Sequence, residues 1–200
     1  MYGAIGRTHP LPTRASTGDD AVEPTGRADA AAFRKTYAEH SERVWRFLAR
    51  LGVPPSDLED LLQEVFVVVH RRLPEFDGAV PFSTWLFAIA FRIAKNHRRW
   101  RWRHRLARLV GLEEGWAGAD PERELDRKEA ASELSSILER IESRKRAVLV
   151  LYELEGLDGP AIARIVGCPV HTVWSRLRAG REDFKRLVRR RQALSGRGEP

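Results

Sequence analysis

The chain has 200 residues, of which 35 are Lys or Arg and 28 are Asp or Glu, so its formal net charge is +7. This length fits one domain or two small ones rather than a large multidomain enzyme. No apolar run approaches the roughly 20 residues of a membrane span, and the N-terminus lacks the apolar region of a signal peptide. One cysteine, Cys168, excludes an internal disulfide. We therefore expect a cytoplasmic protein, without membrane insertion, whose partner is a polyanion.

Turn residues and apolar periodicity divide the first half of the chain. Residues 1–28 are rich in Gly, Pro, Thr and Asp without apolar periodicity, and we expect a disordered tail there. A first helix is predicted over about 29–51, where apolar residues fall at helical spacing. Ser56 then begins a capping-box pattern that predicts a second helix, which Pro74 ends.

A loop over residues 74–82 leads to a third predicted helix, which Ser83 is expected to cap and which fades by about residue 109. Residues 110–132 are predicted to be an acidic linker. Within the linker, Asp120 followed by Pro121 predicts the start of another helix.

The second half is also predicted to be helical. Ser143 opens one helical segment, and two short helices over 158–166 and 170–179 flank a turn at Gly167. No alternating strand pattern of useful length is present. The sequence therefore predicts an all-α protein with two small helical domains, residues 29–109 and 133–195, joined by a flexible linker.

The net charge is not spread evenly along the chain. Residues 29–110 hold 15 basic and 9 acidic residues, a net +6, and residues 133–195 hold 13 and 8, a net +5. Between them, residues 111–132 hold 3 basic and 7 acidic residues, a net −4. The stretches 92–108 and 176–191 each contain eight Lys or Arg. Such clustering favours phosphate-binding surfaces, although a solvated helix face would also carry charge runs.

Residues 156–182 carry the strongest local motif. Gly167 permits the left-handed conformation of a tight turn, and Val173 and Leu177, four apart, are predicted to pack the second helix inward. The pattern indicates a DNA-binding helix-turn-helix rather than an ordinary helical hairpin. The polar face of the predicted recognition helix comprises His171, Thr172, Ser175, Arg176 and Arg178.

Three segments in order resemble the sigma-70 family, specifically its small extracytoplasmic function (ECF) subgroup of bacterial transcription initiation factors. Residues 57–66 read Asp-Leu-Glu-Asp-Leu-Leu-Gln-Glu-Val-Phe, residues 82–90 read Phe-Ser-Thr-Trp-Leu-Phe-Ala-Ile-Ala, and residues 168–177 read Cys-Pro-Val-His-Thr-Val-Trp-Ser-Arg-Leu. The likeness covers roughly residues 30–108 and 133–190. It implies sigma region 2 in the first domain and sigma region 4 in the second.

The resemblance implies that the segment at 57–66 docks on core RNA polymerase. For Phe66, packing in the protein's own core is an equally good interpretation. The acids at the start of this helix would also favour its N-terminal half without any partner. The residues expected at the polymerase contact are Asp57, Asp60, Leu61, Gln63, Glu64 and Phe66.

The resemblance implies that the loop at 74–82 and the helix after it melt the minus-ten promoter element and hold a flipped base. Base stacking on aromatic residues is worth about 1–3 kcal/mol per base. Trp100 and Trp102 are two apart and cannot share one helix face, so which of them stacks on DNA stays open. The expected minus-ten residues are Phe76, Asp77, Gly78, Trp85, Arg92, Lys95, Asn96, Arg98, Arg99 and Trp100.

The recognition helix would read the minus-thirty-five element. In this family the acidic linker is threaded through the polymerase, although a plain solvated linker is equally compatible with the sequence. We also expect an anti-sigma factor as a partner. The minus-thirty-five residues expected from the resemblance are His171, Thr172, Trp174, Ser175, Arg176, Arg178 and Arg181.

The sequence departs from the family pattern at several positions. Arg92 stands where many relatives carry Asn, Ile141-Glu142 replaces a common Leu-Pro, and Trp174 replaces a usual basic residue. Ala179-Gly180 replaces Arg-Ala, and a Gly inside a helix costs about 1 kcal/mol relative to Ala. These changes predict a weaker or reshaped minus-thirty-five contact.

Two other functions fit the sequence less well than a sigma factor does. A stand-alone helix-turn-helix regulator would not need the docking segment or the aromatic and basic helix of the first half. An enzyme would need clustered acids or a nucleophile beside a base, whereas the six His residues are scattered. We therefore expect no catalysis, no cofactor and no metal site.

Overall fold

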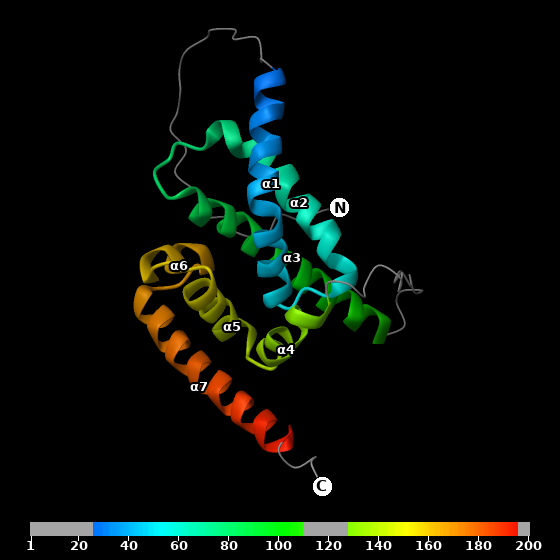
Figure 1. The fold of residues 1–200 in the computed structure, drawn as a ribbon, viewed down its shortest axis with the longest axis vertical. Helices are drawn as coiled ribbons and strands as arrows, with labels where there is room; N and C mark the ends of the chain where they lie inside the picture. The colour runs from blue at the N-terminus through cyan, green and yellow to red at the C-terminus, as the bar shows by residue number, and fades with distance from the viewer. Residues whose placement is uncertain (1–25, 110–127, 196–200) are drawn as a thin grey trace.

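The structure is a computed structural model that describes residues 26–109 and 128–195. Within these two ranges the chain forms helices and no strand (Figure 1), which confirms the all-α prediction. Residues 1–25 of the expected tail and 110–127 of the expected linker, including the helix start predicted at Asp120, lie outside the described residues, whereas residues 26–28 and 128–132 are helical rather than tail or linker.

Three long helices build the first domain. They are α1 (Gly26–Arg50), α2 (Pro55–Arg72) and α3 (Phe82–Leu109), with a 3-10 turn, η1 (Leu73–Glu75), after α2. Their apolar stripes face one another because apolar residues recur every three or four positions. The largest fully buried side chains contributed by the three helices are Val44, Phe47, Leu48, Val65, Val69, Leu86 and Phe87.

The starts of α2 and α3 differ from the sequence prediction. The N-cap of α2 is Pro54, without a side-chain cap, and Pro55 occupies the first turn, where no amide hydrogen is needed. Ser56 is therefore inside the helix, and its Oγ donates a hydrogen bond to Oδ1 of Asp57 at 2.6 Å. In the same way α3 begins at Phe82, so Ser83 lies within its first turn.

The second domain contains four helical segments and one π-helical turn. They are α4 (Lys128–Glu139), α5 (Ser143–Leu149), the π-helix η2 (Val150–Leu154), α6 (Gly159–Val166) and α7 (Val170–Ser195). Glu142 caps α5, since its Oε2 accepts a hydrogen bond from the backbone N of Lys145 at 3.2 Å. The side chains of Leu138, Val148, Leu151, Ile162 and Leu177 are fully buried in this domain.

The helix-turn-helix has the predicted geometry. Oδ1 of Asp158 caps α6 by accepting a hydrogen bond from the backbone N of Ala161 at 2.7 Å. Gly167 adopts φ +72°, the left-handed conformation expected for the turn. However, α7 is one helix to residue 195 and does not end near 179. Gly180 lies inside this helix and faces α5: a Cβ at Gly180 would lie 3.4 Å from the carbonyl O of Lys145.

The two domains contact each other. Helices α1 and α3 of the first domain pack against α4 and α6 of the second, and Figure 1 shows α4 to α7 on the lower side of α1 and α3 in this view. The buried apolar residues of both domains form one connected cluster. The described ranges therefore pack as a single body around one continuous hydrophobic core.

Candidate nucleic-acid interface

The exposed face of α2 carries the polar residues of the predicted docking segment. Asp60, Gln63 and Glu64 are exposed, and Val67, one turn further on, continues this face into solvent. Sequence reasoning missed Val67, although its spacing from Asp60 and Glu64 along the helix could have indicated it. The exposed face is thus acidic and amide-bearing, with an apolar residue at its end.

Two residues predicted for the polymerase contact lie in the protein's core instead. Phe66 is only 2% exposed, and its ring packs edge-on against Tyr37, with centroids 4.7 Å apart. Leu61 is also buried. Both side chains point away from the exposed face because they fall on the apolar stripe of α2. They pack α2 against the rest of the first domain.

Asp57 of α2 contacts two residues of α3 within the first domain. Its Oδ2 lies 3.1 Å from Nε2 of His97 and 3.1 Å from a guanidinium nitrogen of Arg101, both in α3. Burial lowers the pKa of His97 below its ordinary value of 6.5, the neighbouring Arg101 lowers it further, and Asp57 opposes the shift. The His97 ring is therefore neutral near pH 7 and orients α3 against α2.

The loop before α3 is held by an aromatic cluster. Phe76 packs against Phe82 and Trp85, with ring centroids 5.5 and 5.2 Å apart. Trp85 is buried and Phe76 half-buried, so these two predicted minus-ten residues serve as packing for the loop. Asp77 and Gly78 remain exposed at its tip. Oδ1 of Asp77 accepts a hydrogen bond from the backbone N of Ala79 at 3.0 Å, and Gly78 has φ +71°.

The remaining predicted residues of α3 are on the surface. The two tryptophans take different directions, as their spacing requires. Trp100 stacks on His97, with centroids 6.0 Å apart and planes at 24°, whereas Trp102 is 65% exposed. The exposed predicted residues of this helix are Arg92, Lys95, Asn96, Arg98, Arg99 and Trp100.

In α7, Val173 and Leu177 are buried as predicted, and His171, Ser175 and Arg178 are exposed on the opposite face. Oγ of Ser175 donates a hydrogen bond to the backbone O of Thr172 at 3.0 Å. These residues lie at i, i+4 and i+7, so they form one open stripe along the helix.

Trp174 and Arg181 are held along one flank of α7 by the second domain itself. The ring of Trp174 packs edge-on against Tyr152, with centroids 5.7 Å apart. Nε of Arg181 lies 2.6 Å from Oε1 of Glu153, and its guanidinium lies 5.3 Å from the centre of the Tyr152 ring. Sequence reasoning missed these partners, which sit about 20 to 30 positions earlier in the chain.

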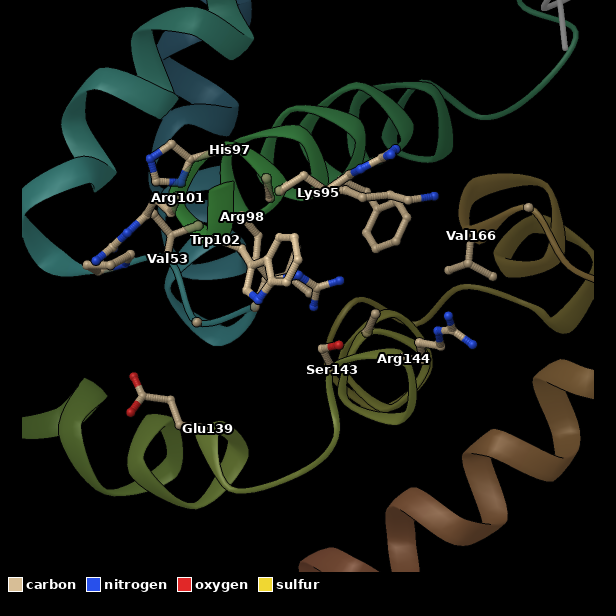
Figure 2. Close-up of a pocket in the computed structure, with 18 of the residues that line it drawn as sticks. Val53, Lys95, His97, Arg98, Arg101, Trp102, Glu139, Ser143, Arg144 and Val166 are labelled. Atoms are coloured by element: carbon tan, nitrogen blue, oxygen red, sulfur yellow. The ribbon is translucent and has the colours of Figure 1, made fainter. Parts of the chain in front are cut away.

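A cleft of about 930 Å³ opens between the two domains. One wall is α3, with Lys95, Arg98 and Trp102, and the other is formed by α4 to α7, with Arg144 of α5 and Arg176 of α7. Figure 2 shows Lys95, Arg98 and Trp102 facing Ser143 and Arg144 across this space. Among the described residues that line the cleft, several are Lys or Arg and Glu139 is the one that is acidic.

No group of three or more His, Cys, Asp or Glu that could hold a metal ion occurs within residues 26–109 and 128–195. None of the helices described there is long and apolar enough to cross a membrane.

An acidic helix face, a basic helix with aromatic residues and an open helix-turn-helix together define a DNA-binding transcription protein. Comparison with known families identifies which class of transcription protein it is. The family models for Sigma-70 region 2 and Sigma-70, region 4 match residues 36–104 and 131–184.

Relatives match along most of the chain. The sequence is 31% identical over 176 residues to RNA polymerase sigma-H factor of Pseudomonas aeruginosa, covering 84% of this chain and 91% of that protein. It is 32% identical over 176 residues to the ECF RNA polymerase sigma-E factor of Escherichia coli K12, covering 84% and 92%. The chain belongs to the sigma-70 family, in its ECF subgroup, and is thus a sigma factor for promoter recognition and transcription initiation.

A solved structure has the same fold. It is the complex of the sigma factor RpoE with the anti-sigma factor NepR from Bartonella quintana, whose sigma factor matches with a TM-score of 0.62 at 19% sequence identity, covering 79% of this chain and 97% of that one. The likeness confirms the architecture of two helical domains.

Proposed function

We propose that the exposed face of α2 docks on core RNA polymerase, that α3 with the loop before it melts the minus-ten element, and that α7 reads the minus-thirty-five element. The observation that carries this division is the stripe of His171, Ser175 and Arg178, which is exposed while Val173 and Leu177 opposite it are buried. A helix so arranged presents donors and acceptors to base edges in the major groove.

The polymerase contact involves the exposed residues of α2, namely Asp60, Gln63, Glu64 and Val67. An acidic surface suits a basic partner helix, and Val67 adds an exposed apolar contact at the end of this face. Leu61 and Phe66 act indirectly, by fixing the helix that carries this face.

The minus-ten contact involves Asp77 and Gly78 at the loop tip and the basic face of α3. Arg and Lys there neutralise phosphates, while an exposed aromatic ring offers a platform for an unstacked base. Unstacking costs a few kcal/mol, which these contacts must offset. Trp102, 65% exposed, is better placed to stack than Trp100, whose ring already lies on His97.

The factor contributes binding and melting, and the chemistry of RNA synthesis belongs to the polymerase. Its place of action is accordingly the cytoplasm. We also propose an anti-sigma factor as a partner. The anti-sigma factor bound to the structural relative from Bartonella quintana supports this proposal.

Run-off transcription tests the proposed function. The purified protein with core polymerase should start transcripts from a cognate promoter, the region upstream of its own gene being the first template to try. Arg178→Ala should reduce use of the minus-thirty-five element, by about 1–3 kcal/mol if it contacts a base, while core binding in a pull-down stays intact. Lys35→Ala is the matched control, because it also removes one positive charge but lies on the exposed surface of α1. Absence of transcripts from every template would overturn the proposal.

A further inference from the structure

The cleft between the two domains has the size of a small-molecule site. Its volume of about 930 Å³ lies within the range of about 300–1,000 Å³ that is usual for such sites. Duplex DNA does not fit this space, because its major groove alone is about 12 Å wide and 8.5 Å deep. The cleft is therefore suited to a small molecule rather than to a promoter duplex.

Basic side chains line the cleft from both domains. The six are Lys95, Arg98, Arg99, Arg101, Arg144 and Arg176. Glu139 is the one acid among the described residues of the lining, and Figure 2 shows it near one end of the cleft, with Arg144 toward the other. Asp57 offsets the charge of Arg101, since its Oδ2 lies 3.1 Å from that guanidinium. With these two acids discounted, the cleft keeps about four positive charges.

Most of these cations have no protein partner. Nothing that the structure describes accepts a hydrogen bond from, or forms an ion pair with, Lys95, Arg98, Arg99, Arg144 or Arg176. Arg176 is half-buried and lines the cleft, whereas the other residues of the polar stripe of α7 are exposed. The cleft thus presents donors from two walls without an acceptor between them.

A buried arginine adds to the positive potential beside the cleft. Arg146 of α5 is 9% exposed, and its guanidinium lies against Gly52, which lines the cleft. No described residue accepts a hydrogen bond from its Nε. Burial lowers the pKa of Arg146 below its ordinary value; Glu139 opposes this shift, and Arg98 of α3 adds to it. An anion between α3 and α5 would relieve the repulsion between Arg98 and Arg146.

A linear triphosphate matches the charge of the cleft. At neutral pH it carries about four negative charges on three adjacent phosphates, close to the positive charge that the cleft keeps. Guanidinium groups bind phosphate oxygens through paired, parallel hydrogen bonds. An acidic peptide has at most one charge per residue, that is, per about 3.3 Å of extended chain. It therefore places fewer charges in the same space.

An exposed aromatic ring lies beside these charges. Trp102 lines the cleft and is 65% exposed, and Figure 2 shows its ring in the space between α3 and α5. Such a ring offers a stacking platform for a nucleobase. A nucleoside triphosphate would use both this ring and the cations, whereas inorganic tripolyphosphate would use the cations alone.

We propose that this cleft is a binding site for a linear triphosphate, with the basic residues of α3 on one side and Arg144 and Arg176 on the other. The inference goes beyond the proposed function, because it concerns the free protein without polymerase or promoter. Arg144 belongs to neither the proposed polymerase contact nor the proposed promoter contacts. A variant of Arg144 therefore separates the triphosphate site from the proposed function.

Isothermal titration calorimetry of the purified full chain tests the site, with ATP and inorganic tripolyphosphate as separate probes and without Mg²⁺. The wild-type protein should bind one triphosphate per chain. Arg144→Gln should raise the Kd about tenfold, as expected for the loss of a charge-assisted hydrogen bond, and Lys95→Gln should act similarly from the other wall. Arg164→Gln is the matched control and should leave the Kd unchanged, since Arg164 is exposed in the second domain but does not line the cleft.

Three results would overturn the site. The first is that neither probe binds. The second is binding at several equivalent sites, or an equal rise of the Kd in Arg164→Gln, because either would show adventitious binding of anions to a basic surface. The third is an unchanged Kd in Arg144→Gln or in Lys95→Gln, since the site requires contacts from both walls.

The two probes distinguish the source of the triphosphate. ATP that binds at least about fivefold more tightly than tripolyphosphate, with the difference lost in Trp102→Ala, assigns the site to a nucleotide. Equal Kd values assign it to inorganic polyphosphate. A hexaglutamate peptide that binds more tightly than both probes would overturn the proposal in favour of an acidic protein segment. Failure to support transcription, with normal triphosphate binding, would count against the proposed function alone.

Discussion

Asp57 of α2 and His97 of α3 meet with Oδ2 and Nε2 3.1 Å apart. The contact ties the helix proposed to dock on polymerase to the helix proposed to engage the minus-ten element. Because Arg101 contacts the same carboxylate oxygen at 3.1 Å, Asp57 has two partners within its own domain. Its role in the free protein is thus to align two functional helices.

The first prediction concerns the pH dependence of stability. The pKa of His97 is lower in the folded protein than its ordinary 6.5, chiefly because the ring is partly buried. At and below this pH the unfolded chain therefore binds more protons than the folded protein, so the stabilisation is complete above about pH 6.5 and is lost as the pH falls from there through the folded-state pKa of His97. Urea unfolding at about pH 7.5 and 5.5 should show a smaller loss of stability in His97→Gln than in the wild type. An equal loss of stability in the two proteins would mean that groups other than His97 cause the pH dependence of stability.

The second prediction separates packing from docking on α2. Phe66→Ala removes a buried ring and should lower the free energy of unfolding by about 3–5 kcal/mol. Glu64→Ala should leave stability within about 0.5 kcal/mol of the wild type and weaken core polymerase binding in a pull-down. Glu39→Ala on α1 is the control for loss of an exposed acid. If Glu64→Ala binds core polymerase normally, Glu64 is not part of the docking face.

The third prediction tests the close contact between Gly159 and Trp174. A Cβ at Gly159 would lie 2.5 Å from Cζ2 of the Trp174 ring, so Gly159→Ala should destabilise the protein by about 1–3 kcal/mol through overpacking. In a Trp174→Ala background the same substitution should cost much less. A double-mutant cycle by chemical denaturation gives the coupling energy. Additive effects would show that the ring moves aside freely.

The helix-turn-helix could be predicted from sequence because its determinants are local. The turn at Gly167, the buried pair Val173 and Leu177, and the polar stripe on the opposite face all follow from spacing within one short segment. The same reasoning predicted that both halves are helical, since apolar periodicity depends only on neighbours a few positions away.

Contacts between charged residues far apart in the sequence could not be predicted in this way. In the sequence Glu155 is a single acidic residue after an apolar run. Nothing near it indicates that its partner is Arg43, 112 positions earlier. The sequence likewise indicates only that Asp57 is an acidic residue at the start of a helix. Its partner Arg101 lies 44 positions away. Periodicity tells which face of a helix is apolar, but the packing of helices decides which charges meet across the interface.

The last prediction concerns Gly180, which the sequence suggested would weaken the recognition helix. The structure places it inside a continuous α7, where an added Cβ would lie 3.4 Å from the carbonyl O of Lys145 and 3.6 Å from Cβ of Leu149. These separations are ordinary van der Waals contacts, and Ala is favoured over Gly in a helix by about 1 kcal/mol. Gly180→Ala should therefore raise the free energy of unfolding by about 0.5–1 kcal/mol, measured by chemical denaturation. A loss of stability would instead mean that α5 and α7 need the closer backbone approach that only Gly allows.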